Sequence, residues 1–355
     1  MRAAAILGPG SVAKSLATFQ RLTGAEWTSL IEQADVAVIF GGDGTVHRHL
    51  SELVQLEVPL LVVPCGSGND FARALKVRNV RDAAHAWKKF AATGNARPVD
   101  LGVISALRVP NGTKPQNAAQ PFSGAETVPF SVVPDPRVLR AAEVVPVRTG
   151  VKIRTPASTA VEVLPFPGDN VASETLLGES AEAISPHEHY FCCVAGVGID
   201  TEIARRANAL PQWLRARGGY ALSAPGRFIR FAPFPMKVSC NGAGAGSFQP
   251  TILASLANAP AYGGGMKIAP NAKLDDGKLD LCVVRGMNAL KLFCLFPTVY
   301  FGRHLGFKEV EYEQIDCVRV ETEFPLDVFA DGEYVCQTPV EFRVARGALN
   351  VITAD

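Results

Sequence analysis

Two short apolar segments stand out in the first quarter of the chain, at Val36–Phe40 and Pro59–Pro64. Each consists mainly of Val, Ile or Leu. Each is followed by a glycine cluster and then by a stretch with apolar residues at helical spacing. Continuous apolar runs of this length are typical of parallel strands that are covered on both faces. The pattern therefore predicts two buried parallel strands whose ends open onto glycine-rich loops.

The rest of the N-terminal pattern alternates between strands and helices. We expect a strand at Arg2–Leu7, a helix after Ser11, a short helix around Trp27–Ala34, a helix at Val80–Thr93 and a strand at Arg97–Ile104. The helix after the first glycine cluster should begin near Val46, and Asn69-Asp70 should cap the helix after the second. This alternation predicts an α/β domain with a parallel sheet.

The C-terminal half has mostly strand-like patterns. Strands are expected at Tyr190–Val197, Pro235–Cys240, Thr251–Asn258, Lys278–Val284, Cys317–Thr322, Leu326–Ala330, Val340–Val344 and Leu349–Thr353, with helices through Ala209 and at Met287–His304. Between the halves, 11 of the 25 prolines fall in residues 105–189, where periodicity is weak. We therefore predict an α/β domain at 1–103 and a β-sandwich at 190–345. Between them, a Pro-rich insertion at 104–189 is expected to be partly disordered or to carry an added hairpin, Val144–Arg154 with Thr159–Leu164. A final strand at 346–355 can return to the first domain.

Composition narrows the class of protein. With 355 residues, the chain can form two cores, and its net charge of +1 gives no general attraction to nucleic acid. The most apolar stretch, Leu290–Phe301, is too short for a membrane span and contains Pro297. The eight cysteines form no C-x-x-C pair, and the N-terminus is more typical of a strand than of a signal peptide. These features favour a cytoplasmic protein.

The two glycine clusters are candidate phosphate sites. They read Gly41-Gly42-Asp43-Gly44-Thr45 and Gly66-Ser67-Gly68-Asn69-Asp70. A glycine turn at a helix N-terminus presents free N–H groups and the positive end of the helix dipole to an anion. Asp43 beside phosphates would require a divalent cation. A lone cluster could be only a tight turn, but two of them after buried strands favour phosphate binding.

Three further acidic positions each allow two interpretations. Asp100 lies in an apolar strand, and it could either cap a neighbouring turn or serve a metal site. Asp331-Gly332-Glu333 follows a strand, and could be an exposed hairpin tip or a catalytic element. Asp276-Gly277 could be an ordinary hairpin turn or part of a metal site.

The motifs GGDGTV and PCGSGNDFAR resemble the catalytic domain of the diacylglycerol kinase and sphingosine kinase superfamily, particularly its bacterial soluble lipid kinases. The resemblance implies an NAD-kinase-like α/β domain followed by a β-sandwich, with ATP and Mg²⁺ as cofactors. It implies that Glu333 is the catalytic base, with Asp43 catalytic beside it, and that a structural Mg²⁺ is held by Asp276 with the carbonyls of Lys273 and Lys278. The implied ATP-binding residues are Gly41, Gly42, Asp43, Gly44, Thr45, Gly66, Ser67, Gly68, Asn69 and Asp100.

The expected activity is ATP-dependent phosphorylation of a hydroxyl of diacylglycerol or a related lipid. The family's GGDGT is commonly followed by Val-Asn-Glu, whereas this chain has Val46-His47-Arg48, and Cys193 replaces a usual asparagine. Arg48 reverses the charge of that glutamate. Two alternatives stay open: a kinase of a non-lipid hydroxyl such as NAD, and a catalytically silent nucleotide- or lipid-binding protein.

A lipid substrate implies transient peripheral contact with the inner face of the membrane. Trp213–Lys237 mixes aromatic and arginine residues, which would suit anionic headgroups but equally a partly buried helix with a solvated basic edge. No nucleic-acid partner is expected. The oligomeric state is open, with a homodimer as one option.

Overall fold

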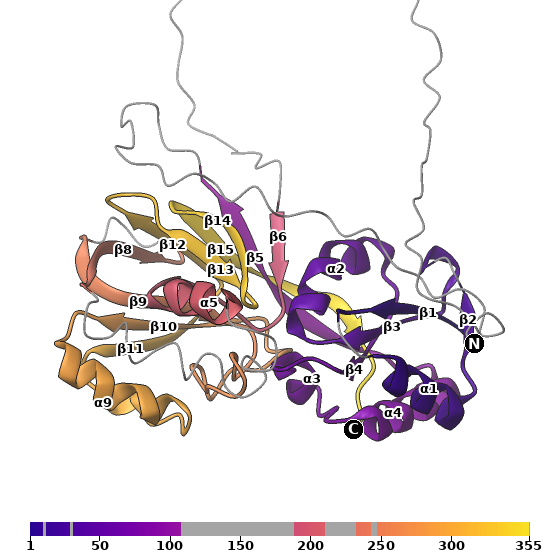
Figure 1. Cartoon of the computed structure of the whole chain (residues 1–355). Helices are drawn as coiled ribbons and strands as arrows, with labels where there is room; N and C mark the ends of the chain where they lie inside the picture. The colour runs from indigo at the N-terminus through magenta and orange to yellow at the C-terminus, as the bar shows by residue number, and fades with distance from the viewer. Residues whose placement is uncertain (10–11, 29–30, 108–187, 210–231, 243–246, 355) are drawn as a thin grey trace, which may run out of the picture.

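The computed structural model describes residues 1–9, 12–28, 31–107, 188–209, 232–242 and 247–354. The predicted hairpin at Val144–Leu164 and most of Trp213–Lys237 lie outside the described residues. One mixed sheet of 15 strands runs through both halves of the described chain (Figure 1). No helix in these ranges is both long and apolar enough to cross a bilayer.

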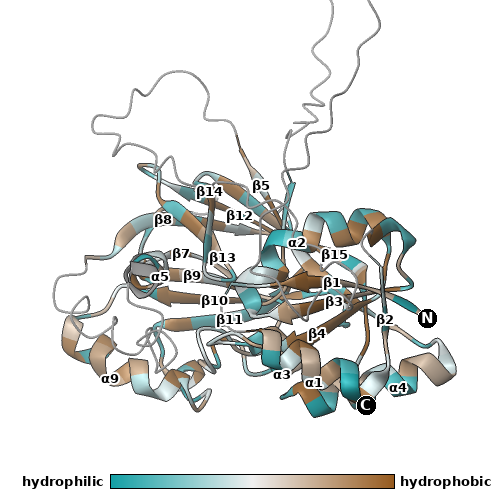
Figure 2. Ribbon diagram, turned by 45° about the vertical axis from the view of Figure 1, so that its right-hand side comes forward, coloured by the Kyte–Doolittle hydropathy of each residue, from teal (hydrophilic) through white to brown (hydrophobic). Residues whose placement is uncertain are grey.

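The N-terminal half is a parallel sheet in the order β2-β1-β3-β4. Its strands are β1 (Arg2–Leu7), β2 (Glu26–Thr28), β3 (Val36–Gly41) and β4 (Leu60–Pro64). Helix α2 (Asp43–Leu56) lies on one face, and α1 (Ala13–Thr23) and α4 (Val80–Thr93) lie on the other, in both ribbon views (Figure 1 and Figure 2). Phe19 of α1 contacts Phe40 and Trp87, with ring centroids 5.6 and 5.8 Å away. Covering on both faces explains why β3 and β4 are continuously apolar.

The C-terminal half is predominantly antiparallel. Its strands are β5 (Arg97–Ala106), β6 (Glu188–Phe191), β7 (Val194–Gly198), β8 (Phe234–Cys240), β9 (Gln249–Ala257), β10 (Leu279–Arg285), β11 (Val310–Ile315), β12 (Cys317–Thr322), β13 (Asp327–Ala330), β14 (Glu333–Gln337) and β15 (Val340–Val351). The helices are α5 (Ile199–Ala209) and α9 (Ala289–Val299). One core cluster, which includes Ala195, Leu281 and Phe342, lies in this half, and other buried residues of the half belong to the cluster that fills the N-terminal half. The predicted α/β region followed by a β-sandwich is confirmed.

Strand β15 joins the two halves. It pairs with β5 along its length and with β12, and its end reaches β4, where Val351 pairs with Leu60 in parallel. The ladder is irregular between Ala345 and Leu349. Because of this pairing, the end of the chain lies against the strands that carry the glycine clusters.

Several predicted boundaries were wrong. Trp27 lies in the short strand β2, followed by a 3-10 turn at Ile31–Gln33, because the segment pairs with β1. Tyr190–Val197 is two strands separated at Cys192-Cys193, and the last two predicted strands are one. The helix predicted at Met287–His304 is shorter, with a separate 3-10 turn at His304–Gly306, and β11 and β14 were not predicted.

Candidate active site

The two glycine clusters touch. Gly41 at the end of β3 pairs with Pro64 at the end of β4, and the Cys65 N–H donates to the Gly41 carbonyl at 2.8 Å. A Cβ added to Gly42 would lie 2.9 Å from the Gly66 Cα. Backbones this close leave no space for a side chain at either position. The two predicted phosphate-binding turns therefore form a single surface.

Asp43 connects these turns at the first residue of α2. Its carboxylate accepts hydrogen bonds from the backbone N–H groups of Asp70 and Phe71, both at 3.0 Å. These N–H groups begin α3 (Asp70–Ala74), so Asp43 caps this short helix from another segment. Asn69 occupies the N-cap position, as predicted, but its side chain does not cap the helix. Asn69 has φ 57°, and its side chain bonds the N–H and carbonyl of Gly66 instead.

Helix α2 begins at Asp43, earlier than the predicted start near Val46. Gly44 and Thr45 therefore belong to its first turn. Thr45 is buried, and its hydroxyl would be 2.5 Å from a Cβ added to Gly8. Ser67 is exposed beside Gly66. Of the two hydroxyl side chains among the predicted ATP-binding residues, Ser67 is thus on the surface, whereas Thr45 packs beneath the turn.

Two carboxylates lie together behind the turns. A Cβ at Gly68 would lie 2.7 Å from Oδ2 of Asp43 and 3.6 Å from Oδ2 of Asp70. Burial, and then the negative charge of Asp70, raise the pKa of Asp43 to about 6. Burial also raises the pKa of Asp70, although that carboxylate pairs with Arg73 at 2.6 Å and accepts from the Gly264 N–H at 2.7 Å. Adjacent carboxylates that ionise reluctantly fit a divalent cation, which would neutralise both.

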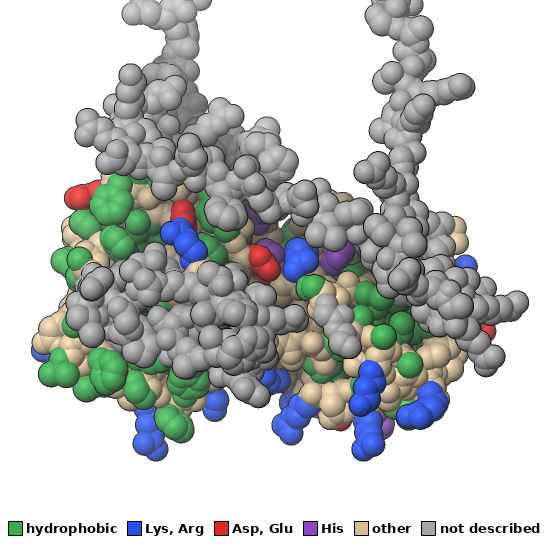
Figure 3. Space-filling view, in the orientation of Figure 1, with side chains coloured by type: hydrophobic (Ala, Val, Ile, Leu, Met, Phe, Trp, Pro, Cys, Tyr) green, Lys and Arg blue, Asp and Glu red, His purple; other side chains and the backbone are tan. Residues whose placement is uncertain are grey.

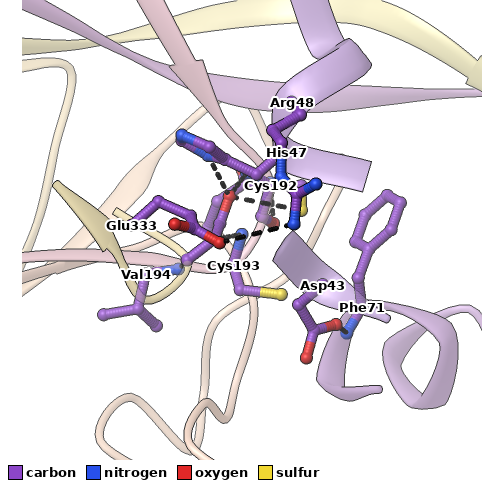
Figure 4. Close-up of polar contacts among 10 residues, drawn as sticks. Asp43, His47, Arg48, Phe71, Cys192, Cys193, Val194 and Glu333 are labelled. Carbon is purple, nitrogen blue, oxygen red and sulfur yellow. Dashed lines mark hydrogen bonds and ion pairs between the residues drawn. The ribbon is translucent and has the colours of Figure 1, made fainter. Parts of the chain in front are cut away.

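Glu333 reaches this place from the C-terminal half. It is the first residue of β14, and a Cβ at Gly44 would lie 2.7 Å from its Oε1. The absence of a side chain at Gly44 therefore leaves the space that the Glu333 carboxylate occupies. The Arg48 guanidinium, one turn further along α2, lies 3.9 Å from the same oxygen (Figure 4). Arg48 thus pairs with the predicted catalytic base.

Asp331 fixes the hairpin that carries Glu333. Its buried carboxylate accepts from the N–H groups of Cys192, Cys193 and Val194 at 2.9, 2.8 and 3.2 Å. It also contacts Nδ1 of His47 on α2 at 3.1 Å. These contacts lock the β13–β14 turn against both β7 and α2. The sequence prediction did not assign this role, although His47 directly follows the GGDGTV motif and Asp331 begins the Asp331-Gly332-Glu333 element.

The thiols beside Asp331 do not favour a metal centre. Ligand atoms of Cys192, Cys193 and Asp331 lie within 4.8 Å of one another. Burial raises the pKa of Cys192 to about 12, and that of Cys193 is also raised, chiefly by its contact with Cys192. Protonated thiols are poor ligands, and the carboxylate is already bonded to three N–H groups.

The structure gives Asp100 other partners than the glycine turns. Its carboxylate accepts from the N–H groups of Gly277 and Gly347, each at 2.7 Å. Its own N–H donates to the Leu274 carbonyl at 2.6 Å. Asp100 therefore ties β5 to the 274–278 turn and to β15. Its contact with the nucleotide stays a prediction, and the capping alternative describes the contacts observed.

The turn predicted to hold a structural Mg²⁺ is the one that Asp100 binds. Asp276 is exposed and accepts from the Lys278 N–H at 3.2 Å and from the Gln314 side chain at 3.0 Å. The Lys278 ammonium pairs with Asp316 at 2.8 Å, away from Asp276. The Asp276 carboxylate and the carbonyls of Lys273 and Lys278 thus belong to one turn, and their role as ligands stays a prediction.

The structure thus places glycine turns of the N-terminal half opposite a carboxylate of the C-terminal half. Two family models match the chain: "Diacylglycerol kinase catalytic domain" at residues 13–104, and "YegS C-terminal NAD kinase beta sandwich-like domain" at 193–353. The chain belongs to this diacylglycerol kinase and YegS-like family, and it is a lipid kinase.

Individual relatives agree with this assignment. The chain is 26% identical over 320 residues to a diacylglycerol kinase of Mycobacterium tuberculosis, covering 90% of this chain and 76% of the relative. It is 22% identical over 327 residues to a diacylglycerol kinase of Bacillus subtilis, covering 90% and 78%. A crystal structure of a diacylglycerol kinase from Bacillus anthracis matches with TM-score 0.53 and 17% identity, covering 99% of this chain and 96% of that one. The last likeness supports the fold.

Proposed function

We propose that this protein transfers the γ-phosphoryl group of ATP to a hydroxyl of diacylglycerol or a related lipid, at the cytoplasmic face of the membrane. One observation carries the proposal. The Glu333 carboxylate, on a hairpin of the C-terminal domain, lies against Gly44 in the first turn of α2. A base for the acceptor hydroxyl and a turn suited to phosphate are thereby adjacent, as phosphoryl transfer requires.

The ATP phosphates are held mainly by backbone. The touching turns at Gly41–Thr45 and Gly66–Asn69 offer N–H groups without side chains in the way, and α2 directs its positive end toward the bound anion. Ser67 adds an exposed hydroxyl. Phosphoryl transfer depends mostly on positioning and charge neutralisation, and this surface supplies both.

Asp43 is the residue that holds Mg²⁺, with Asp70 next to it. Their close approach and the raised pKa of Asp43 support a site for a cation. The bound ion would neutralise charge on the phosphates. Asp100, in β5, holds the neighbouring turn through the Gly277 N–H. In that turn Lys273, Asp276 and Lys278 would form a second, structural site for Mg²⁺.

Glu333 takes the proton from the lipid hydroxyl as that oxygen attacks phosphorus. General base catalysis of this kind contributes about 10²–10⁴ in rate. Asp331 and His47 position the base by fixing its hairpin on α2. Arg48, which pairs with Glu333, stands at a position where the family commonly has a glutamate. At this position the chain therefore differs in charge from the common family pattern.

The test is an ATP turnover assay with diacylglycerol, sphingosine and NAD as separate acceptors. Turnover on a lipid should fall by about 10² or more in Glu333→Gln and should also collapse in Asp43→Asn. Glu341→Gln is the matched control, because Glu341 is also half-buried but lies in β15. Turnover on NAD alone would support the non-lipid alternative. ATP binding without turnover on any acceptor would support a silent protein, and full lipid activity in Glu333→Gln would refute the assigned base.

A further inference from the structure

Helix α9 presents apolar side chains on two faces. Leu292, Leu295 and Val299 are buried against the core. The outward side carries Leu290 (74% exposed), Phe293 (52% exposed), Cys294 and Pro297, and Phe301 (74% exposed) follows just after the helix. We call Leu290, Phe293 and Phe301 the α9 apolar face. In Figure 2 the ribbon of α9 is mostly in the hydrophobic colours.

The fold does not explain this exposure. A helix at the surface of a globular protein normally has polar residues on its outward side, and a helix that is apolar all round is normally buried. Lys291 is the one charged residue in α9, and it pairs with Glu309 at 2.6 Å. Contiguous apolar surface of this kind usually marks an interaction site.

Exposed basic side chains surround the face. Lys267, Arg303 and Lys308 are all exposed. Backbone contacts place two of them at the C-terminal end of α9: the Lys267 N–H donates to the Val299 carbonyl at 3.1 Å, and the Arg303 N–H donates to the Thr298 carbonyl at 3.0 Å. Figure 3 shows hydrophobic side chains together with Lys and Arg along the lower left edge, where Figure 1 places α9.

In the described part of the chain, the two acids that follow Lys308 are paired. Glu309 binds Lys291, and Glu311 binds Arg285 at 2.7 Å. The unbalanced charge around the α9 apolar face is therefore positive. An apolar face with a basic rim is complementary to an anionic lipid surface, into which such helices insert at the level of the headgroups.

We propose that the α9 apolar face, with Lys267, Arg303 and Lys308, docks this protein onto anionic phospholipid membranes. This proposal rests on the lipid kinase function proposed above, because the α9 apolar face would make the membrane contact through which the enzyme reaches a lipid acceptor. It locates that contact on α9, whereas the sequence offered Trp213–Lys237 for such a contact only as one of two interpretations.

The face is connected to the active site by a short segment. The Gly264 N–H donates to Asp70, beside Asp43, and the Lys267 N–H donates to the end of α9. Three residues span at most about 11 Å. Docking through α9 would thus bring the membrane close to the domain boundary where the acceptor must enter.

Co-sedimentation with vesicles tests the docking directly. Vesicles of equal parts phosphatidylcholine and phosphatidylglycerol should bind the full chain, and vesicles of phosphatidylcholine alone should bind it more weakly. Phe293→Gln should weaken binding about tenfold, from the lost burial of one large side chain. Phe248→Gln should leave binding unchanged, because Phe248 is similarly exposed (45%) but lies outside this face.

The charged rim has its own matched pair. Arg303→Gln should weaken binding to the anionic vesicles about fivefold, whereas Arg319→Gln on β12 should not. Unchanged urea midpoints would show that all four variants fold normally. Binding that is equal in Phe293→Gln and the unmodified protein would overturn the proposal.

A second copy of the chain is the competing occupant. Sedimentation velocity without lipid would then show a dimer that Phe293→Gln dissociates, together with vesicle binding that the substitution does not change; this result would also overturn the proposal.

Turnover measurements separate membrane docking from catalysis. Phe293→Gln should lose about tenfold on vesicle-borne diacylglycerol and stay within about twofold on a short-chain diacylglycerol dispersed in detergent. If no acceptor is turned over in any form, the kinase function fails, while the vesicle measurement still decides the docking.

Discussion

Replacing Asp43 with asparagine should remove a pH-dependent loss of stability from the folded protein while abolishing its activity. Burial and Asp70 raise the pKa of Asp43 from 3.8 to about 6. At 1.36 kcal/mol for each pH unit, ionised Asp43 costs the folded state about 3 kcal/mol above pH 6. An asparagine side chain cannot ionise, so the variant avoids this cost. Asparagine has only one acceptor oxygen, so one of the two N–H groups of α3 loses its acceptor, which would take back about 1–3 kcal/mol at every pH.

The pH dependence is the distinguishing signature. Asp43 binds its proton more tightly in the folded than in the unfolded chain, so between pH 3.8 and about 6 the free energy of unfolding falls as pH rises. Asp43→Asn lacks this fall. Its stability advantage over the unmodified protein should therefore grow by about 2 kcal/mol between about pH 4.5 and about pH 7.5.

Urea denaturation with EDTA, followed by tryptophan fluorescence, measures the effect. Trp27 and Trp87 both lie in the N-terminal core around Phe19 and report on this domain. Asp200→Asn is the control, since burial also raises the pKa of Asp200 to about 6. For both variants the difference in stability from the unmodified protein should grow with pH, but added Mg²⁺ should reduce this difference only for Asp43→Asn. A difference between Asp43→Asn and the unmodified protein that does not change with pH would refute the reasoning.

Three further predictions concern single positions. Gly44→Ala should lower kcat, because its Cβ would lie 2.7 Å from Oε1 of Glu333. The same substitution should raise the urea midpoint, because the higher helix propensity of alanine stabilises α2 by up to about 1 kcal/mol. Asp331→Ala should destabilise by about 3 kcal/mol or more, since three buried N–H groups lose their acceptor, and equal stability in urea would contradict this. Gly102→Ala should destabilise by at least about 1–3 kcal/mol, because its Cβ would overlap the Phe191 ring, and an unchanged thermal midpoint would disprove the packing argument.

The sequence determined the features that depend on neighbouring residues. The apolar runs of β3 and β4 and the periodic spacing of Val80–Thr93 predicted elements close to their observed bounds. The glycine clusters were predicted to be turns at the ends of two buried strands, and they follow β3 and β4, whereas their binding of phosphate stays a prediction. These signals are local, because burial on both faces and helical periodicity each determine the residue types within a single segment.

The tertiary structure alone decided how distant side chains meet. His47 and Asp331 are 284 residues apart in the chain, and no local pattern indicates that they touch. The cap on α3 comes from Asp43, a residue of a different helix. Arg48 faces Glu333 because the first residue of β14 lies beside the first turns of α2, and this depends on strand register across the whole sheet. Sequence patterns specify which face a side chain takes, whereas its partner is fixed only when separate elements pack together.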